Sequence, residues 1–106
     1  MSDSLQQLSQ SLQQFADARD WGQFHAPKNL ASALIVEAAE LLEHFQWMTE
    51  AQSRELDADK KQAVAHEMAD VLLYLVQLAS GLNIDLLQAA REKMLLNAQK
   101  YPAHRA

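Results

Sequence analysis

The sequence predicts an all-α fold, and three observations support this prediction. Alanine, leucine and glutamine number 18, 17 and 12 among the 106 residues, whereas valine, isoleucine and threonine number only 4, 2 and 1. This composition favours helix over strand. Glycine and proline number two each, so the chain can build few tight turns. A mass of 11.9 kDa fits a single domain, which we place at residues 1–106.

Composition also excludes several classes of protein. The chain has no cysteine, which excludes disulfides and thiolate metal sites. Its longest stretch without a charged residue, 71–84, is shorter than the roughly 20 residues that span a bilayer. A net charge of −5 argues against a nucleic-acid polymer as partner. We therefore expect a soluble, cytoplasmic protein that binds neither a membrane nor a nucleic-acid polymer.

The first half of the chain shows two helical patterns separated by a loop. Leucines and a phenylalanine at spacings of three and four predict a helix over 4–18. The segment 19–28 has no apolar period and contains several aromatic side chains, so it is predicted to be an aromatic loop. A second helix is predicted to begin at 27–29, where proline suits a first turn, and to continue to about Met48.

Two further helices are predicted in the second half. The third begins after Asp57 or Asp59, the latter with the glutamine spacing of a capping box, and ends at Gly81, a residue suited to the position after a helix. The fourth begins at Asp85 and ends before Pro102. The sequence therefore predicts a four-helix bundle.

Six consecutive apolar residues, 71–76, make the third helix hydrophobic on all sides. A single four-helix chain would leave part of this surface in contact with water. We therefore expect a homo-oligomer that completes the bundle.

Acidic residues stand where apolar residues are expected on two of these helices. Glu37 and Glu67 each lie three residues after one apolar residue of the core-facing stripe and four before the next. Each has an acidic partner one turn further on, Glu40 and Asp70. The short connection 49–56 makes the two helices antiparallel neighbours, so four carboxylates can converge.

Converging carboxylates repel one another, and neither stripe contains an arginine or lysine. A cation from solution is the expected compensation, and Mg²⁺ or Mn²⁺ suits oxygen ligands better than Zn²⁺. The alternative is a solvated acidic face. The ferritin-like di-iron class is not matched, because it requires Glu-x-x-His on two helices and no glutamate here has that spacing. His44 and His66 are interpreted as ordinary helical residues or as neighbours of the site.

Four segments resemble a known family. They are RDWGQFHAPKNL, NLASALIVEAAELLEHFQW, HEMADVLLYLVQLA and KMLLNAQKYP, and together they reach across nearly the whole chain. The resemblance is to the MazG-like all-α nucleoside triphosphate pyrophosphohydrolases, in particular the dCTP-pyrophosphatase-like branch. It implies a MazG-like bundle that assembles as a dimer or tetramer with sites at the subunit interfaces.

The resemblance implies hydrolysis of a nucleoside triphosphate, dCTP or a related or modified dNTP, to the monophosphate and pyrophosphate, as in sanitation of the nucleotide pool. Glu37, Glu40, Glu67 and Asp70 would hold Mg²⁺, and Glu37 or Glu40 would act as general base. Glu43 would lie just outside the metal site.

Substrate-binding positions follow from the same resemblance. Lys93, Asn97 and Tyr101 would contact the phosphates and sugar, with Lys100 or Lys28 as further phosphate partners. Trp21 and Trp47 would border the base, since flat aromatic faces stack on bases, although each could instead belong to the core. The remaining candidates for the base pocket are His25, Tyr74 and Phe24.

Two positions depart from the branch. Leu12 stands where members carry a histidine that helps to enclose the base, and Leu95 stands where they carry an acidic residue. Base selectivity is therefore open, and hydrolysis of dUTP or phosphoribosyl-ATP is the alternative activity. An alternative of another class is a non-catalytic helical module that oligomerises and binds a partner through Trp21 and Trp47.

Overall fold

The computed structural model describes residues 4–103 and is helical, with no strand in that range. The prediction of an all-α fold is confirmed. The termini of the predicted domain 1–106 lie outside the described residues. The elements are α1 (Ser4–Ala18), the 3₁₀ turn η1 (Gly22–Phe24), α2 (Pro27–Glu43), α3 (Glu50–Arg54), α4 (Ala58–Gly81) and α5 (Leu86–Lys100).

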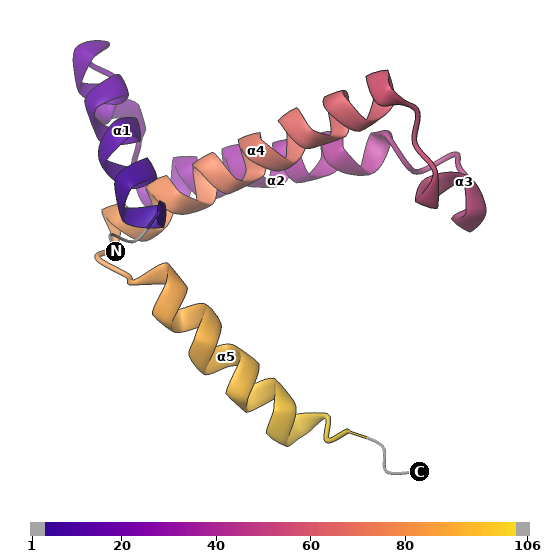
Figure 1. Ribbon diagram of the computed structural model, residues 1–106. Helices are drawn as coiled ribbons and strands as arrows, with labels where there is room; N and C mark the ends of the chain where they lie inside the picture. The colour runs from indigo at the N-terminus through magenta and orange to yellow at the C-terminus, as the bar shows by residue number, and fades with distance from the viewer. Residues whose placement is uncertain (1–3, 104–106) are drawn as a thin grey trace.

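Helices α2 and α4 lie side by side and antiparallel, and they form the centre of the molecule (Figure 1). Helix α1 packs across the C-terminal end of α4, and α3 lies beyond the opposite end of the pair. Among the described residues, five apolar side chains are buried, and they come from α1, α2 and α4: Ala16, Leu30, Val64, Val76 and Ala79.

The end of α1 fixes the position of the aromatic loop. Asp20 adopts a left-handed conformation with φ of 55°, and the Trp21 N–H donates to the Ala16 carbonyl at 2.9 Å. This is the hydrogen-bond pattern of a Schellman motif, in which the residue after the turn packs back on the helix. The Trp21 ring accordingly meets the Phe15 ring edge-on at 5.5 Å between centroids.

Helix α2 ends at Glu43, five residues before the predicted end at Met48. After Glu43 the N–H groups of His44, Phe45 and Met48 donate to the carbonyl three residues earlier rather than four, so the chain continues as turns instead of α-helix. A new helix then begins after residue 48. The Thr49 side chain accepts from the Gln52 N–H, while the Gln52 side chain accepts from the Thr49 N–H, which is a complete capping box. These bonds start α3 within the segment 49–56 that the sequence analysis treated as a connection.

Helix α4 begins after Asp57, whose carboxylate accepts from the Lys60 N–H at 2.8 Å. The alternative start at Asp59 is wrong, because Asp59 lies in the first turn. Asp85 caps α5 as predicted and accepts from the Gln88 N–H at 3.1 Å.

Gly81 is the last residue of α4 rather than the residue after it, which corrects the predicted end. The left-handed position is taken by Asn83, with φ of 54°. The Ile84 N–H donates to the Ala79 carbonyl at 2.9 Å, again as in a Schellman motif. Asparagine tolerates this conformation better than most residues, so glycine is not required there.

Helix α5 leads away from the other helices after a bend of 101° (Figure 1). The accessible surface is 8649 Å², against about 5,900 Å² for a compact monomer of this mass. The radius of gyration is 17.0 Å, where about 13 Å is typical for this length. The described chain is therefore extended and leaves many apolar side chains exposed, among them Ile35, Val36, Leu42, Met68, Met94 and Leu95.

Within residues 4–103, no single helix has the length and apolarity of a membrane span. Only α4 and α5 taken together, across their bend, pass such a test.

Candidate metal site between two helices

The seam between α2 and α4 has a register that two contacts define. Glu37 of α2 interacts with Glu67 of α4. Seven residues after Glu37, just past the end of α2, the Nδ1 atom of His44 lies 3.4 Å from the Nζ atom of Lys60. Lys60 is also seven residues from Glu67, in the opposite direction along the chain. Seven residues of α-helix rise about 10 Å, so the two contacts are two turns apart.

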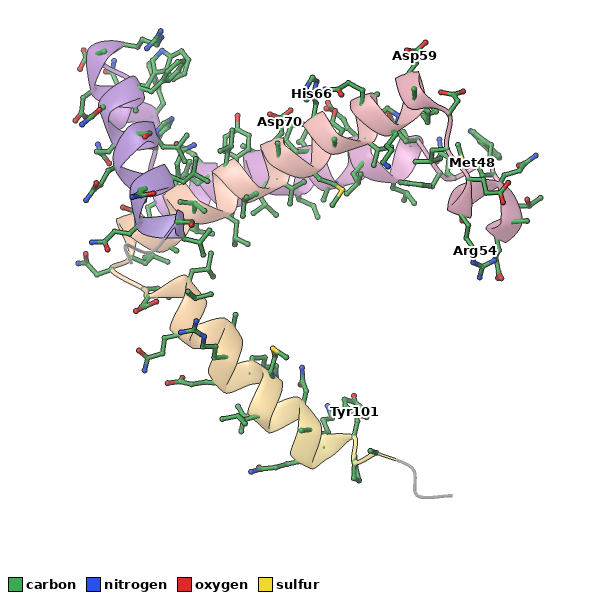
Figure 2. The ribbon with its side chains drawn as sticks, in the orientation of Figure 1. Met48, Arg54, Asp59, His66, Asp70 and Tyr101 are labelled. Atoms are coloured by element: carbon green, nitrogen blue, oxygen red, sulfur yellow. The ribbon has the colours of Figure 1, made fainter. Side chains whose placement is uncertain are left out.

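Three of the four predicted carboxylates meet at one point on this seam. Glu37, Glu67 and Asp70 each place one carboxylate oxygen within 4.8 Å of the others. Figure 2 shows Asp70 near the middle of α4. Glu40 lies outside this group of three, although its side chain acts on Glu37. The structure therefore brings together three of the predicted ligands and leaves the fourth beside them.

The carboxylates are poorly compensated in the metal-free protein. One oxygen of Glu37 and one of Glu67, Oε2 in each case, are shielded from solvent and have no hydrogen-bond partner. A buried polar atom without a partner costs free energy, and a charged one costs more. These two oxygens are suited to bind a cation.

The pKa of Glu37 is raised by this lack of compensation. It rises from an ordinary value of 4.5 to about 7. The main cause is the hydrogen bond that Glu37 can make to Glu67 once it is protonated, followed by burial, then by the same kind of bond to Glu40 and by the negative charges of both neighbours. Protonation of Glu37 would therefore relieve part of the repulsion that a bound cation would otherwise relieve.

The donor set fits a hard divalent cation. All the converging atoms are carboxylate oxygens, the ligands that Mg²⁺ and Mn²⁺ prefer, and the described residues bring no histidine into the group. Glu37, Glu67 and Asp70 would hold the ion directly, with Glu40 adjacent. His66 is turned elsewhere, since its Nε2 atom accepts from the Gln62 amide at 2.7 Å.

The aromatic candidates near the start of α2 lie at one end of the seam. Trp21 is 43% exposed, and its ring meets the His25 ring edge-on at 6.5 Å. His25 lines a hollow of about 180 Å³ together with Leu30 and Gln77. Tyr74 is half-buried on α4, one turn beyond Asp70 on the same face. Phe24 is exposed in η1.

Trp47 lies at the opposite end of α2 and is 89% exposed, so it is not a core residue of this chain. The 17 residues of α2 are about 25 Å long and separate it from Trp21. One base cannot lie against both tryptophans of a single chain.

The predicted phosphate and sugar contacts lie on α5. Lys93 and Asn97 are exposed along this helix, and Tyr101, 69% exposed, follows its end. Figure 2 shows Tyr101 far from Asp70, because α5 leads away from α4. The structure therefore does not bring these three residues to the carboxylates of the same chain.

Lys60 lies on the same seam and was not among the predicted residues. The apolar stripe of the third predicted helix begins at Val64 and contains no cation, but Lys60 lies one turn before Val64 on the same face. Its spacing of seven residues from Glu67 was the available signal. Its partner is His44, which the sequence left open as an ordinary helical residue or a neighbour of the site.

Comparison with protein families matches residues 33–106 to the model described as "MazG-like family". The similar curated proteins include several named dCTP pyrophosphatase 1. That of Mus musculus is 46% identical over 93 residues, which is 86% of this chain and 55% of the relative. That of Homo sapiens is 44% identical over 95 residues, 88% of this chain and 56% of the relative. The chain thus spans about half the length of these relatives.

Comparison with solved structures finds a similar fold. A crystal structure of a pyrophosphatase from Archaeoglobus fulgidus DSM 4304 matches with a TM-score of 0.89 and 38% sequence identity. The match covers 97% of this chain and 96% of that one.

The raised pKa of Glu37 predicts how the stability of the metal-free protein depends on pH. Glu37 is protonated in both the folded and unfolded states well below pH 4.5, so it costs the fold nothing there. As the pH rises from 4.5 to about 7, the unfolded state ionises more readily and the free energy of unfolding falls.

Urea unfolding in the presence of a chelator, measured across this range, tests the prediction. Glu37→Gln should make the free energy of unfolding less dependent on pH. Glu43→Gln, which changes an exposed carboxylate on the same helix, is the matched control and should leave the dependence unaltered. Equal slopes for wild type and Glu37→Gln would contradict the assignment.

Proposed function

The chain belongs to the MazG-like family, and we propose that it is a Mg²⁺-dependent nucleoside triphosphate pyrophosphohydrolase. The observation that carries the proposal is the group of Glu37, Glu67 and Asp70 with two unpartnered buried oxygens. A helical binding module has no use for carboxylates placed at such cost.

The chemistry requires charge neutralisation on the phosphates and an oriented water. Bound Mg²⁺ would polarise the phosphate oxygens and lower the pKa of a bound water. Glu37, Glu67 and Asp70 would bind the ion. Glu40 lies next to these ligands without joining their group, so we assign it as the carboxylate that accepts the proton of the attacking water.

The names of the curated relatives support a deoxynucleoside triphosphate as substrate, with dCTP or a related or modified dNTP first. Hydrolysis to monophosphate and pyrophosphate would serve sanitation of the cytoplasmic nucleotide pool. Activity on dUTP or phosphoribosyl-ATP is the alternative on the same fold.

The active form is proposed to be a homo-oligomer, a dimer or tetramer. The described chain exposes about 2,700 Å² more than a compact monomer would, an area of the size that obligate interfaces bury. A second copy would also bring together site residues that lie far apart in one chain. The pair of tryptophans and the α5 residues Lys93, Asn97 and Tyr101 can reach one site only if copies combine.

The activity is tested by measuring pyrophosphate release from the four common dNTPs, modified dNTPs, dUTP and phosphoribosyl-ATP. Release from at least one dNTP is expected with Mg²⁺ and none with a chelator. Glu37→Gln should abolish release, because the site loses a ligand. Mg²⁺ should also raise the melting temperature of wild type, since it binds only the folded state.

The stability measurement provides the control for Glu37→Gln. The variant without metal should melt at or above the wild-type temperature, because one buried like charge is removed. An active Glu37→Gln protein, or a wild-type melting temperature that ignores millimolar Mg²⁺, would contradict the metal site.

The assembly is tested by light scattering after size-exclusion chromatography. We expect the mass of a dimer or tetramer for wild type. Ile35→Glu, which places a charge on an exposed apolar position of α2, should lower the mass. Gln14→Glu, an equal charge change at an exposed polar position of α1, should not. A monomeric wild type would exclude this proposal.

The tryptophans are tested by comparing stability and kinetics in the same variants. Trp47→Ala should change the melting temperature little, because the side chain is 89% exposed, but it should raise KM about 10-fold, the loss expected for a stacking contact of about 1.4 kcal/mol. Trp21→Ala should raise KM similarly and also lower stability, because it loses the contact with Phe15. Unchanged KM in both would place base recognition elsewhere.

A further inference from the structure

Lys60 is a half-buried cation on the same seam as the carboxylates. It lies on α4, and its Nζ atom donates toward the Nδ1 atom of His44, the residue that follows the end of α2 across the seam. This contact ties one flexible side chain to the neighbouring helix. The ammonium group is therefore held about two turns, or 10 Å of helix, from the Glu37 and Glu67 pair.

No acidic side chain among the described residues forms an ion pair with Lys60. Among residues 4–103 the single ion pair joins Arg54 and Glu50, so no carboxylate oxygen lies within 4 Å of the Lys60 ammonium group. The Asp57 carboxylate, one turn away, accepts from the Lys60 backbone N–H instead. In a protein with a net charge of −5, a half-buried lysine without an acidic partner is available to an anion.

Two sides of Lys60 differ in charge. On one side is a hollow of about 420 Å³ that Glu55 and Asp57 also line, and their negative charges disfavour an anion. On the other side is the seam, where a cation at the carboxylates would attract a phosphate chain. An anion that contacts Lys60 is therefore expected along the seam.

We propose that Lys60, positioned by its contact with His44, binds the end of the phosphate chain furthest from the nucleoside and so sets the direction in which the nucleotide lies along the α2 and α4 seam. This inference rests on the proposed function. The opposite end of the seam, with Trp21, His25 and Tyr74, is then the end toward which the base of the same chain's substrate points.

With the nucleotide in this direction, Lys60 contacts the pyrophosphate, which is the leaving group. In the proposed reaction the oxygen of water bonds to the α-phosphorus, and the bond between that phosphorus and the α–β bridging oxygen breaks. Pyrophosphate leaves with the electron pair, while the proton of the water passes to the general base. Lys60 would neutralise charge on the departing pyrophosphate and would have no contact with the monophosphate product.

The experiment uses inorganic pyrophosphate as probe, with binding measured by titration calorimetry in the presence of Mg²⁺. Lys60→Met keeps the apolar stem and removes the charge, and it should weaken pyrophosphate binding roughly 10-fold or more, the loss typical of a charge-assisted hydrogen bond. Lys61→Met, at the exposed neighbouring position, is the matched control and should bind as wild type does. Binding of dCMP should be unchanged in both.

Melting temperatures check that each variant is folded, and Lys60→Gln replaces Lys60→Met if the latter unfolds. Wild type that does not bind pyrophosphate with Mg²⁺, equal binding by the Lys60 variant, or an equal loss in Lys61→Met would overturn the inference. If wild type hydrolyses a dNTP but the Lys60 variant binds pyrophosphate as tightly as wild type does, this inference is refuted and the proposed function stands. Pyrophosphate binding that depends on Lys60, in a protein that hydrolyses no nucleotide, refutes the proposed function alone.

Discussion

Mutual repulsion among carboxylates on facing helices is the constraint on which this structure depends. Glu37 and Glu67 occupy positions of the α2 and α4 seam where apolar side chains would stabilise the pair. The apolar contacts of Leu30, Val64 and Val76 along the same two helices must offset that cost. The raised pKa of Glu37 means that a proton is favoured at this position, because it reduces the repulsion. If the site binds a divalent ion as proposed, the protein without metal gives up some stability in return for that affinity.

The core is small, so the cost of the buried carboxylates is a larger share of the stability of the chain. Only five apolar side chains are buried within the described residues, and α5 packs little against the rest of the chain. Local motifs rather than core packing fix several positions that matter to the site. The left-handed residues Asp20 and Asn83 end α1 and α4, and the first of these turns sets the Trp21 ring against Phe15. The proposed oligomer would supply packing that a single chain lacks.

The seam is also asymmetric along its length, and this asymmetry gives the site a direction. One end carries the rings of Trp21 and His25, which suit a base. The other carries the Lys60 ammonium group held by His44, which suits a phosphate. The carboxylates lie between these ends. A linear ligand with an aromatic group at one end and anionic groups at the other matches this order.

The sequence by itself determined the features that depend on local spacing. Ser4–Ala18 and the caps at Asp57 and Asp85 follow from apolar periodicity and from side chains that bond to nearby N–H groups. The convergence of Glu37, Glu67 and Asp70 followed from the same periodicity applied to two antiparallel helices. Local sequence patterns gave the wrong helix boundary where two patterns applied to neighbouring residues. The capping box at Thr49 began a new helix, and Asn83 rather than Gly81 took the left-handed turn.

Only the tertiary structure decided which distant residues meet. The register of α2 against α4 pairs His44 with Lys60 and leaves Glu40 outside the group of three carboxylates, and a shift of one turn would change both. The length of α2 separates Trp21 from Trp47, and the bend after α4 carries Lys93, Asn97 and Tyr101 away from the carboxylates. Spacing within a helix fixes which side chains share a face. It says nothing about where that face lies relative to another helix, because packing between helices sets the register and the angle.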